Sequence, residues 1–310
     1  MNKKGVLLIN LGTPDNCDNK SVYSYLTQFL NDPYVIDLPF FMRWPLVNLV
    51  IVPFRHKKTA EAYQKIWTKE GSPLRLNSMN LAKALSVALG SDYQVELGMR
   101  YGKPSITSAI EKLKNTEEII VIPLFPQYSH AATGSAIAKV SSLSKPIIIK
   151  DFYNNPGFIE SYAEIIKNNT ANKNIDFILF SYHGLPDKPI NQIYQNQCHE
   201  TTRLITEKLN LSKDHYQTTF QSRLGRTPWI KPYTDLVLPE LIQKGIKNIA
   251  IVCPSFVADC LETLEEINIR AREQWQSLGG SEFTFIPCLN ADSQWVEALA
   301  SIVLKQTHSL

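Results

Sequence analysis

The fold is decided by the apolar run Gly5-Val6-Leu7-Leu8-Ile9-Asn10-Leu11 and by a second such run, Ile119-Ile120-Val121-Ile122. In both runs the hydrophobicity is continuous rather than alternating, which is typical of strands that are buried on both faces. Parallel strands of α/β proteins have this property because helices cover both faces of their sheet. The two runs therefore indicate an α/β fold.

Further short runs rich in valine and isoleucine follow along the chain, each succeeded by a polar turn and a helical pattern. The predicted strands are Gly5–Leu11, Tyr93–Tyr101, Glu118–Phe125, Ile147–Asp151, Ile175–Ser181, Tyr216–Ser222, Asn248–Cys253 and Phe283–Pro287. The predicted helices between them include Thr59–Trp67, Met79–Leu89 and Leu261–Trp275. Strands that alternate with helices predict βαβ units, and therefore parallel sheets flanked by helices.

A break at Asn154-Asn155-Pro156-Gly157 divides the predicted strands into two groups of four. We therefore expect two similar α/β lobes, an N-terminal lobe over residues 1–151 and a C-terminal lobe over residues 152–290. A last helix, Trp295–Leu304 within residues 291–310, is expected to return to the first lobe. Ligands of such folds bind beyond the carboxyl ends of the strands, so the expected active site is a cleft between the lobes.

The composition narrows the class of protein. Of the 310 residues, 44% are hydrophobic and 20% are charged, an ordinary globular balance that excludes a disordered chain. The 32 basic and 29 acidic residues leave a net charge of +3, spread along the chain, so charge gives no reason to expect a nucleic-acid partner. The sequence has no signal-peptide pattern and no uncharged run of about 18–20 residues, and we expect a cytoplasmic protein.

The cysteines and the loops after the strands argue against several cofactors. No two of the five cysteines stand at C-x-x-C spacing, which gives no support for a zinc or iron–sulfur site. No G-x-G-x-x-G or G-x-x-x-x-G-K-S/T motif follows a predicted strand. Common nicotinamide, flavin and ATP sites are therefore not expected.

A histidine follows the predicted strand Ile175–Ser181, in the sequence Phe180-Ser181-Tyr182-His183-Gly184-Leu185-Pro186. At a strand end beside a glycine turn, His183 suits an exposed base or a metal ligand, because a neutral imidazole titrates near pH 6.5. The alternative is a histidine that only stabilises its loop by hydrogen bonding.

Two glutamates, Glu262 and Glu266, follow the predicted strand Asn248–Cys253 in a helix that is expected to begin near Asp259. Because they are four residues apart, they share a helix face. Stacked carboxylates repel unless a cation or a proton lies between them, which makes the pair a candidate for catalysis. The alternative is an acidic first turn that the helix dipole stabilises.

Aromatic residues stand close to several predicted strand ends. Tyr101, Tyr128 and Trp229 are candidates to line a cleft for a flat aromatic ligand, with Arg100 to bind its carboxylates. The alternative for each aromatic residue is ordinary core filling.

Seven segments of the chain, in the right order, resemble the ferrochelatase family, whose members insert ferrous iron into a porphyrin to make haem. The segments are Leu8–Pro14, Gly71–Leu74, Met99–Tyr101, Pro126–Ser129 with Thr133–Ser135, Ser181–Pro186, Gln221–Gly225 with Trp229, and Asp259–Leu264. The resemblance implies two Rossmann-like lobes with a porphyrin cleft, and it assigns the iron-binding and proton-accepting pair to His183 and Glu262. It implies substrate-binding residues at Leu11, Arg100, Tyr101, Gln127, Tyr128, Ser129 and Trp229.

The expected reaction is the insertion of Fe²⁺ into protoporphyrin IX with loss of two pyrrole protons. Contacts in the cleft must bend the ring, at a strain on the order of 1–5 kcal/mol. We expect His183 to take protons, and Glu262 with Glu266 to relay them or to hold hydrated ferrous iron. The alternatives are another metal or ring, such as cobalt or coproporphyrin III, and a non-catalytic tetrapyrrole carrier.

The chain departs from the family pattern at two places. Many relatives carry a second histidine where this chain has Cys260, which leaves the part of this position in metal delivery open. Some relatives hold a 2Fe–2S cluster through C-terminal cysteines and one cysteine in the segment that His130 occupies here. This chain reaches Leu310 without such cysteines, so we expect the cluster-free bacterial form, with Fe²⁺ as a substrate and no bound cofactor.

The most apolar segment is Leu38–Phe54, which the basic run Arg55-His56-Lys57-Lys58 follows. We expect Leu46–Val52 to form a buried helix. The residues expected at a cleft lip that weakly touches the inner face of the membrane are Phe40, Phe41, Met42 and Trp44, around Arg43. The other expected partners are porphyrin and ferrous iron, and we expect a monomer or a weak dimer.

Overall fold

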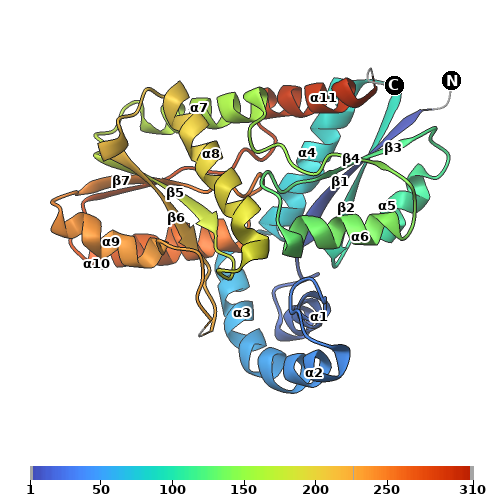
Figure 1. The fold of residues 1–310 in the computed structure, drawn as a ribbon, viewed down its shortest axis with the longest axis horizontal. Helices are drawn as coiled ribbons and strands as arrows, with labels where there is room; N and C mark the ends of the chain where they lie inside the picture. Colours follow the sequence, from blue (N-terminus) through green and yellow to red (C-terminus); the bar gives the residue numbers. More distant parts are fainter. Residues whose placement is uncertain (1–2, 226, 308–310) are drawn as a thin grey trace. The chain divides into compact units, whose positions relative to one another are not determined.

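The computed structural model describes residues 3–225 and 227–307, which form two compact units. Unit 1 comprises residues 1–151 and 291–310, and unit 2 comprises residues 152–290. Each unit contains a parallel four-stranded sheet with helices on both faces (Figure 1). The predicted α/β class, with two four-stranded parallel sheets, is therefore confirmed.

The sheet of unit 1 has the order β2-β1-β3-β4. Its strands are β1 (Lys4–Gly12), β2 (Tyr93–Tyr101), β3 (Ile119–Pro123) and β4 (Ile147–Ile148). In the register of the sheet, Leu8 of the inner strand β1 pairs with Leu97 and with Ile122. All four side chains of Val6–Ile9 are fully buried, as the continuous hydrophobicity predicts.

Helices cover both faces of this sheet. On one face α5 (Ile106–Leu113) and α6 (Ser135–Ser141) pack on a core that includes Leu7 and Val121. Against the sheet also packs α4 (Pro73–Leu89), which contacts the C-terminal helix α11 (Ser293–Thr307). Figure 1 shows the strands between these two pairs of helices.

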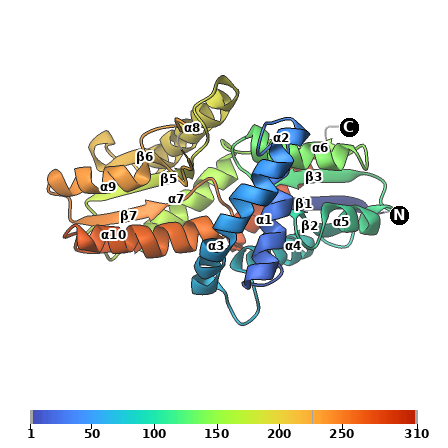
Figure 2. The same cartoon turned by 90° about the horizontal axis from the view of Figure 1, so that it is seen from below.

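A group of helices follows β1 and appears in blue in Figure 2. It consists of α1 (Asn19–Leu30), α2 (Phe40–Pro45), the π-helix η1 (Leu46–Ile51) and α3 (Val52–Ile66). No helix in the described part of the chain is long and apolar enough to cross a bilayer.

The expectation of a buried helix over Leu46–Val52 is wrong for most of its residues. Only Val47 and Val52 are buried, whereas Leu49 is 63% and Val50 is 50% exposed. Val47 and Val52 are five residues apart, the hydrogen-bond spacing of a π-helix, so one narrow stripe faces inward. The rest of the segment presents apolar side chains to the surface.

The sheet of unit 2 has the order β6-β5-β7-β8. Its strands are β5 (Phe177–His183), β6 (Tyr216–Gln221), β7 (Asn248–Val252) and β8 (Glu282–Phe285). One face packs against α9 (Thr234–Gln243), the π-helix η5 (Glu262–Ala271) and α10 (Arg272–Ser277) through a core around Trp275. On the other face, α7 (Pro156–Thr170) packs against α8 (Gln192–Lys208) (Figure 1).

Candidate active site

His183 is the last residue of β5, and its main chain is held on both sides. Its N–H donates to Ser255 Oγ (3.0 Å), and its carbonyl accepts from the hydroxyl of Tyr194 (2.7 Å). Tyr194 lies in α8 and Ser255 follows β7, so two further elements fix the strand end. The imidazole is thereby placed at the carboxyl edge of the sheet, where parallel sheets bind ligands.

One ring nitrogen of His183 is engaged by its own loop. Nδ1 lies 2.6 Å from the carbonyl oxygen of Gly184. A carbonyl oxygen can only accept a hydrogen bond, so Nδ1 carries a proton, and in the neutral ring Nε2 holds the lone pair. The half-buried imidazole thus has Nε2 with which to accept a proton or bind a metal ion.

The segment after β7 is a π-helix over its first ten residues, Glu262–Ala271, and an α-helix only from Arg272. The predicted helix over Leu261–Trp275 is therefore present, but most of it is a π-helix rather than an α-helix. The i→i+5 hydrogen bonds of a π-helix are rare and occur frequently at functional sites. The two candidate glutamates, Glu262 and Glu266, both belong to this π-helix.

The carboxylate of Glu266 accepts two hydrogen bonds from Ser222, at 2.8 Å from N–H and 2.5 Å from Oγ. Arg270 Nη2 lies 4.0 Å away, and the Glu266 side chain is 19% exposed. Burial raises the pKa of Glu266, although the hydrogen bonds of Ser222 and the nearby charges of Arg270 and His183 lower it. A carboxyl group with a raised pKa holds its proton at a pH where an ordinary glutamate has lost it.

Ser222 has a backbone φ of +65°, a left-handed conformation that few non-glycine residues adopt. The conformation turns both its N–H and its hydroxyl toward Glu266. Such strain costs of order 1–3 kcal/mol and is concentrated at functional sites. From the sequence, Ser222 is expected only at the end of a strand, and no sequence pattern predicts a left-handed backbone at this serine.

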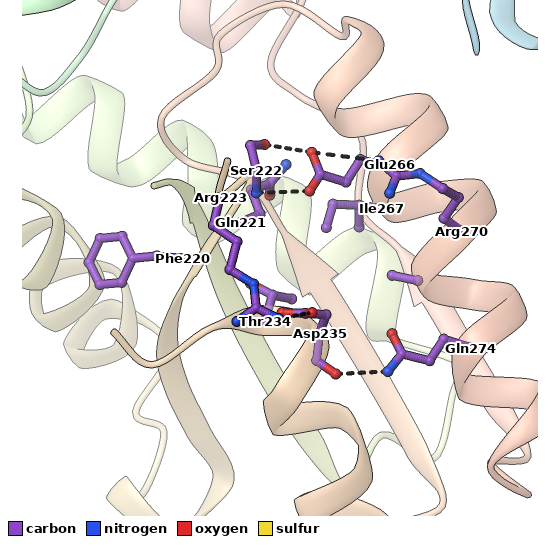
Figure 3. Close-up of a pocket in the computed structure, with 11 residues that line it drawn as sticks. Phe220, Gln221, Ser222, Arg223, Thr234, Asp235, Glu266, Ile267, Arg270 and Gln274 are labelled. Carbon is purple, nitrogen blue, oxygen red and sulfur yellow. Dashed lines mark hydrogen bonds and ion pairs between the residues drawn. The ribbon is translucent and has the colours of Figure 1, made fainter. Parts of the chain in front are cut away.

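A cavity of about 190 Å³ lies next to Glu266 (Figure 3). Besides Ser222 and Glu266, the polar residues that line it are Gln221, Arg223, Thr234, Asp235, Arg270 and Gln274. Asp235 is held by Arg223 Nη2 at 2.7 Å, and its carbonyl accepts from Gln274 Nε2 at 2.7 Å. The carboxylate of Glu266 thus borders a polar cavity whose other charged residues include the exposed Arg223 and Asp235.

Glu262 opens the π-helix, and its carbonyl accepts from Gln221 Nε2 (2.8 Å). Its half-buried side chain lies beside the thiol of Cys260. Burial raises the pKa of Cys260, and the charge and hydrogen bond of Glu262 raise it further. A buried thiol with a raised pKa keeps its proton in the metal-free protein.

Trp229 lies against the residue that follows His183. A Cβ built on Gly184 would stand 3.3 Å from Trp229 Cε3 and 2.6 Å from the carbonyl oxygen of Gln221, so only glycine fits there without displacement. The indole Nε1 donates to the carbonyl of Leu224 (2.8 Å). Unit 2 therefore holds a histidine, two glutamates and an indole at one edge of its sheet.

In unit 1, the predicted ligand residues Arg100 and Tyr101 belong to an internal polar cluster. The buried carboxylate of Asp32 pairs with Arg100 Nη2 and accepts from the hydroxyls of Tyr101 (2.8 Å) and Ser135 (2.7 Å). Arg100 Nε also donates to Ser135 Oγ (2.7 Å). Burial raises the pKa of Tyr101, which is 1% exposed, so its ring lies in the interior rather than on a wall. Asp32 and Ser135 escaped sequence reasoning because nothing local indicates their partners.

Of the other predicted residues of unit 1, Leu11 lies near the end of β1 and the rest follow β3. Leu11 and Tyr128 are half-buried, and Gln127 is buried. Ser129 is buried and caps the π-helix η2 (His130–Gly134), because its Oγ accepts from the N–H of Ala132 (3.1 Å). A capping role explains this serine without a ligand.

Within residues 3–225 and 227–307, no three or more His, Cys, Asp or Glu side chains are grouped so as to hold a metal ion. The short η3 (Pro189–Asn191) and η4 (Lys213–His215) add no predicted site residue.

The fold is similar to that of known chelatases. SirB from Bacillus subtilis with Fe³⁺ matches with a TM-score of 0.57 and 12% identity, over 98% of this chain and 95% of that chain. CbiX, the terminal enzyme of sirohaem biosynthesis in denitrifying bacteria, matches with a TM-score of 0.55 and 12% identity, over 97% of this chain and 98% of that chain. At these identities the likeness concerns the fold alone, which is the chelatase fold.

Comparison of the sequence with known proteins identifies the family. The ferrochelatase family profile matches residues 3–307. The ferrochelatase of Legionella pneumophila (strain Lens) is 49% identical over 331 residues, covering 98% of this chain and 99% of the relative. That of Coxiella burnetii (strain Dugway 5J108-111) is 49% identical over 332 residues, covering 98% and 94%. The chain belongs to the ferrochelatase family, as its motifs indicate, and is an enzyme that inserts a metal ion into a porphyrin.

Proposed function

We propose that this enzyme inserts Fe²⁺ into protoporphyrin IX to form haem, with release of two protons. The observation that carries the proposal is the hydrogen bond from His183 Nδ1 to Gly184, since it leaves Nε2 with the lone pair that the reaction needs. Membership of the ferrochelatase family supports the reaction class.

The two protons need acceptors. When a pyrrole N–H bond breaks, its electron pair stays on the ring nitrogen and forms the bond to iron, while the proton passes to a protein base. We assign the first acceptor to His183 Nε2 and the relay to Glu262 with Glu266. The raised pKa of Glu266 suits a group that must take a proton near neutral pH, and the cavity beside it offers the proton a way out.

The same pair serves the metal in a separate step, because the one lone pair of Nε2 cannot hold a proton and a metal ion at once. His183 and Glu262 are the assigned ligands of hydrated Fe²⁺, because imidazole and carboxylate with open positions hold a ferrous ion weakly enough to release it. Cys260 lies beside Glu262 and is not assigned to the metal in this proposal.

The porphyrin contacts are assigned to the remaining predicted residues. These are Leu11, Gln127, Tyr128, Ser129 and Trp229, whereas Arg100 and Tyr101 are not assigned a direct contact. Among them, the half-buried Trp229 beside Gly184 is best supported as a direct contact. Since Tyr101 is interior and Arg100 is tied to Asp32, their part is to hold the cluster that shapes unit 1.

The proposal also covers the cofactor, the location, the oligomeric state and the membrane contact of the enzyme. The enzyme has no bound cofactor, Fe²⁺ being a substrate, and it works in the cytoplasm as a monomer or weak dimer. The exposed aromatic residues of α2 and the basic residues after them support a weak, peripheral contact with an anionic membrane face. Purified protein without acid-labile sulfide is the expected result for the first assignment, and stoichiometric sulfide contradicts it.

A direct comparison of substrates tests the proposed function. Anaerobic insertion rates are measured for Fe²⁺ and Co²⁺, each with protoporphyrin IX and with coproporphyrin III. We expect the highest kcat/KM for Fe²⁺ with protoporphyrin IX. A faster rate with coproporphyrin III or cobalt would replace the proposed ring or metal, and binding of porphyrin without turnover would indicate a carrier.

A further inference from the structure

Gln221 stands between the two assigned metal ligands. It ends β6 and pairs with His183 in the register of the sheet, where its carbonyl accepts from the N–H of Gly184 (2.8 Å). Its side chain is buried, with 4% exposure, and extends to the π-helix that carries Glu262. One residue therefore touches the main chain on both sides of the candidate site.

Both the nitrogen and the oxygen of the Gln221 amide make hydrogen bonds. Nε2 donates to the carbonyl of Glu262 (2.8 Å), and Oε1 accepts from Ser181 Oγ (2.7 Å) and from Cys253 Sγ (3.6 Å). Because the carbonyl of Glu262 can only accept, the orientation of the amide is fixed by chemistry. Its partners lie on β5, directly after the end of β7 and at the first residue of η5.

Sheet geometry explains why these groups meet. Ser181 and His183 are two residues apart on β5, and Thr219 and Gln221 occupy the paired positions on β6, so all four belong to the same face. This is the face that η5 and α9 cover. Below Gln221 the polar row continues, since Ser181 Oγ lies 2.8 Å from Thr234 Oγ1, which bonds to Thr219 Oγ1 at 2.9 Å.

We propose that Gln221 is a positioning residue for metal insertion, because its buried amide fixes the main chain of Glu262 relative to the strand that carries His183. The inference rests on the proposed function of these two residues. The tie reaches the first residue of a π-helix, a form that is rare and occurs frequently at functional sites. A misplaced ligand costs rate rather than substrate affinity, and a shift of about 1 Å can cost about 100-fold.

The test replaces the amide by an apolar group of similar length. In Gln221→Met the link to Glu262 is lost, and we expect kcat/KM for the metal to fall by about 10-fold or more while the Kd of porphyrin, from fluorescence quenching, stays within about twofold. The matched control is Thr219→Val, which removes a hydroxyl from the same buried row without a bond to Gln221 or Glu262. Thermal melts measure the loss of stability that both variants suffer when a buried hydrogen bond is removed. The control Thr219→Val should keep its activity within about twofold.

A double-mutant cycle separates positioning from general damage. On a Glu262→Gln background, Gln221→Met should change the residual rate by less than about threefold, because the carboxylate that it positions is already absent. Should Gln221→Met not fold, Ser181→Ala, which removes the main partner of Oε1, is measured in the same cycle.

Two results would overturn the inference alone. In the first, the wild type inserts metal and His183→Ala does not, so the proposed function holds, but Gln221→Met is no slower than Thr219→Val. The other is a full, additive loss on the Glu262→Gln background. If the wild type does not insert metal, or if its insertion rate equals that of His183→Ala, both the proposed function and the inference are overturned.

Discussion

His183 Nδ1 donates to the carbonyl of Gly184, and this bond is compatible with both interpretations that the sequence leaves open. The histidine does stabilise its loop, and by doing so it fixes which nitrogen is basic. Ser255 and Tyr194 hold the main chain of the same residue, so the ring has little freedom to turn away. A base that is oriented before the substrate arrives needs no reorganisation during the reaction.

At Glu262, a substitution can remove the negative charge of the side chain and keep its shape. Glu262→Gln keeps the volume of the side chain and most of its hydrogen bonding. If the carboxylate only serves the helix dipole, stability should drop by under about 1 kcal/mol with activity intact. We expect the reverse, a loss of activity of about 100-fold or more with an unchanged melting temperature. Initial rates and melts of one preparation decide between the two results.

At Glu266, the raised pKa predicts a pH-dependent stability. The folded state keeps the proton above the ordinary carboxyl pKa of 4.5, where the unfolded chain has lost it. The folded state then binds more protons, so the free energy of unfolding falls as pH rises through this range. Glu266→Gln, which has no proton to lose, should gain stability relative to the wild type between pH 4 and pH 7 in urea titrations. A constant difference across this range contradicts the assigned shift.

The π-helix η5 shows what periodicity reveals and what it hides. Its buried side chains Thr263, Ile267 and Ala271, and then Trp275 of α10, recur at intervals of four. A straight α-helix has 3.6 residues per turn, so a strict interval of four would drift across its face. An interval of four is compatible with either kind of helix, and the buried Glu265 departs from it, so the pattern does not say which hydrogen bonds form. Those depend on contacts from other elements, such as Gln221, which no local pattern contains.

The turn after β5 gives a prediction at the scale of elements. In Gly184→Ala the new methyl group would stand 2.6 Å from the carbonyl oxygen of Gln221, forcing β5 and β6 apart. We expect a loss of about 1–3 kcal/mol in the free energy of unfolding, with reduced activity. In the control, Gly134→Ala, the methyl group would stand 3.4 Å from its nearest neighbour, an ordinary contact. Equal stability of the two variants in denaturant unfolding would contradict the argument.

On the scale of the whole molecule, the strands were predictable because burial on both faces leaves continuous apolar runs such as Val6–Ile9. The candidate residues at strand ends, His183 above all, followed from the strands. Long-range partners such as Asp32 for Arg100 did not, because they lie far apart in the chain. The exposure of Leu49 was also missed, since an apolar pattern does not say what covers it.

The exposed apolar residues of α2 lead to a prediction for the protein at a surface. Phe41 is 74% and Trp44 is 47% exposed, and basic residues follow in α3. We expect weak, salt-sensitive binding to anionic phospholipid vesicles, because apolar insertion and charge attraction add. Phe41→Ser and Trp44→Ser should lose the binding and still use detergent-solubilised porphyrin. Val87→Ser, at a 78% exposed position of α4, is the control that should bind like the wild type.

Sedimentation with such vesicles at two salt concentrations measures this binding. Equal sedimentation of the wild type and the α2 variants would mean that the apolar group of α2 does not contact lipid.

The central claim is that the lone pair of His183 Nε2 binds the incoming metal and accepts a porphyrin proton in separate steps. Single-turnover insertion of Fe²⁺ into bound protoporphyrin IX, measured under anaerobic conditions for the wild type and His183→Ala, tests it most directly. We predict a rate lower by about 100-fold or more in the variant, with the porphyrin Kd and the melting temperature unchanged. A His183→Ala enzyme that turns over at a near-normal rate would contradict the account.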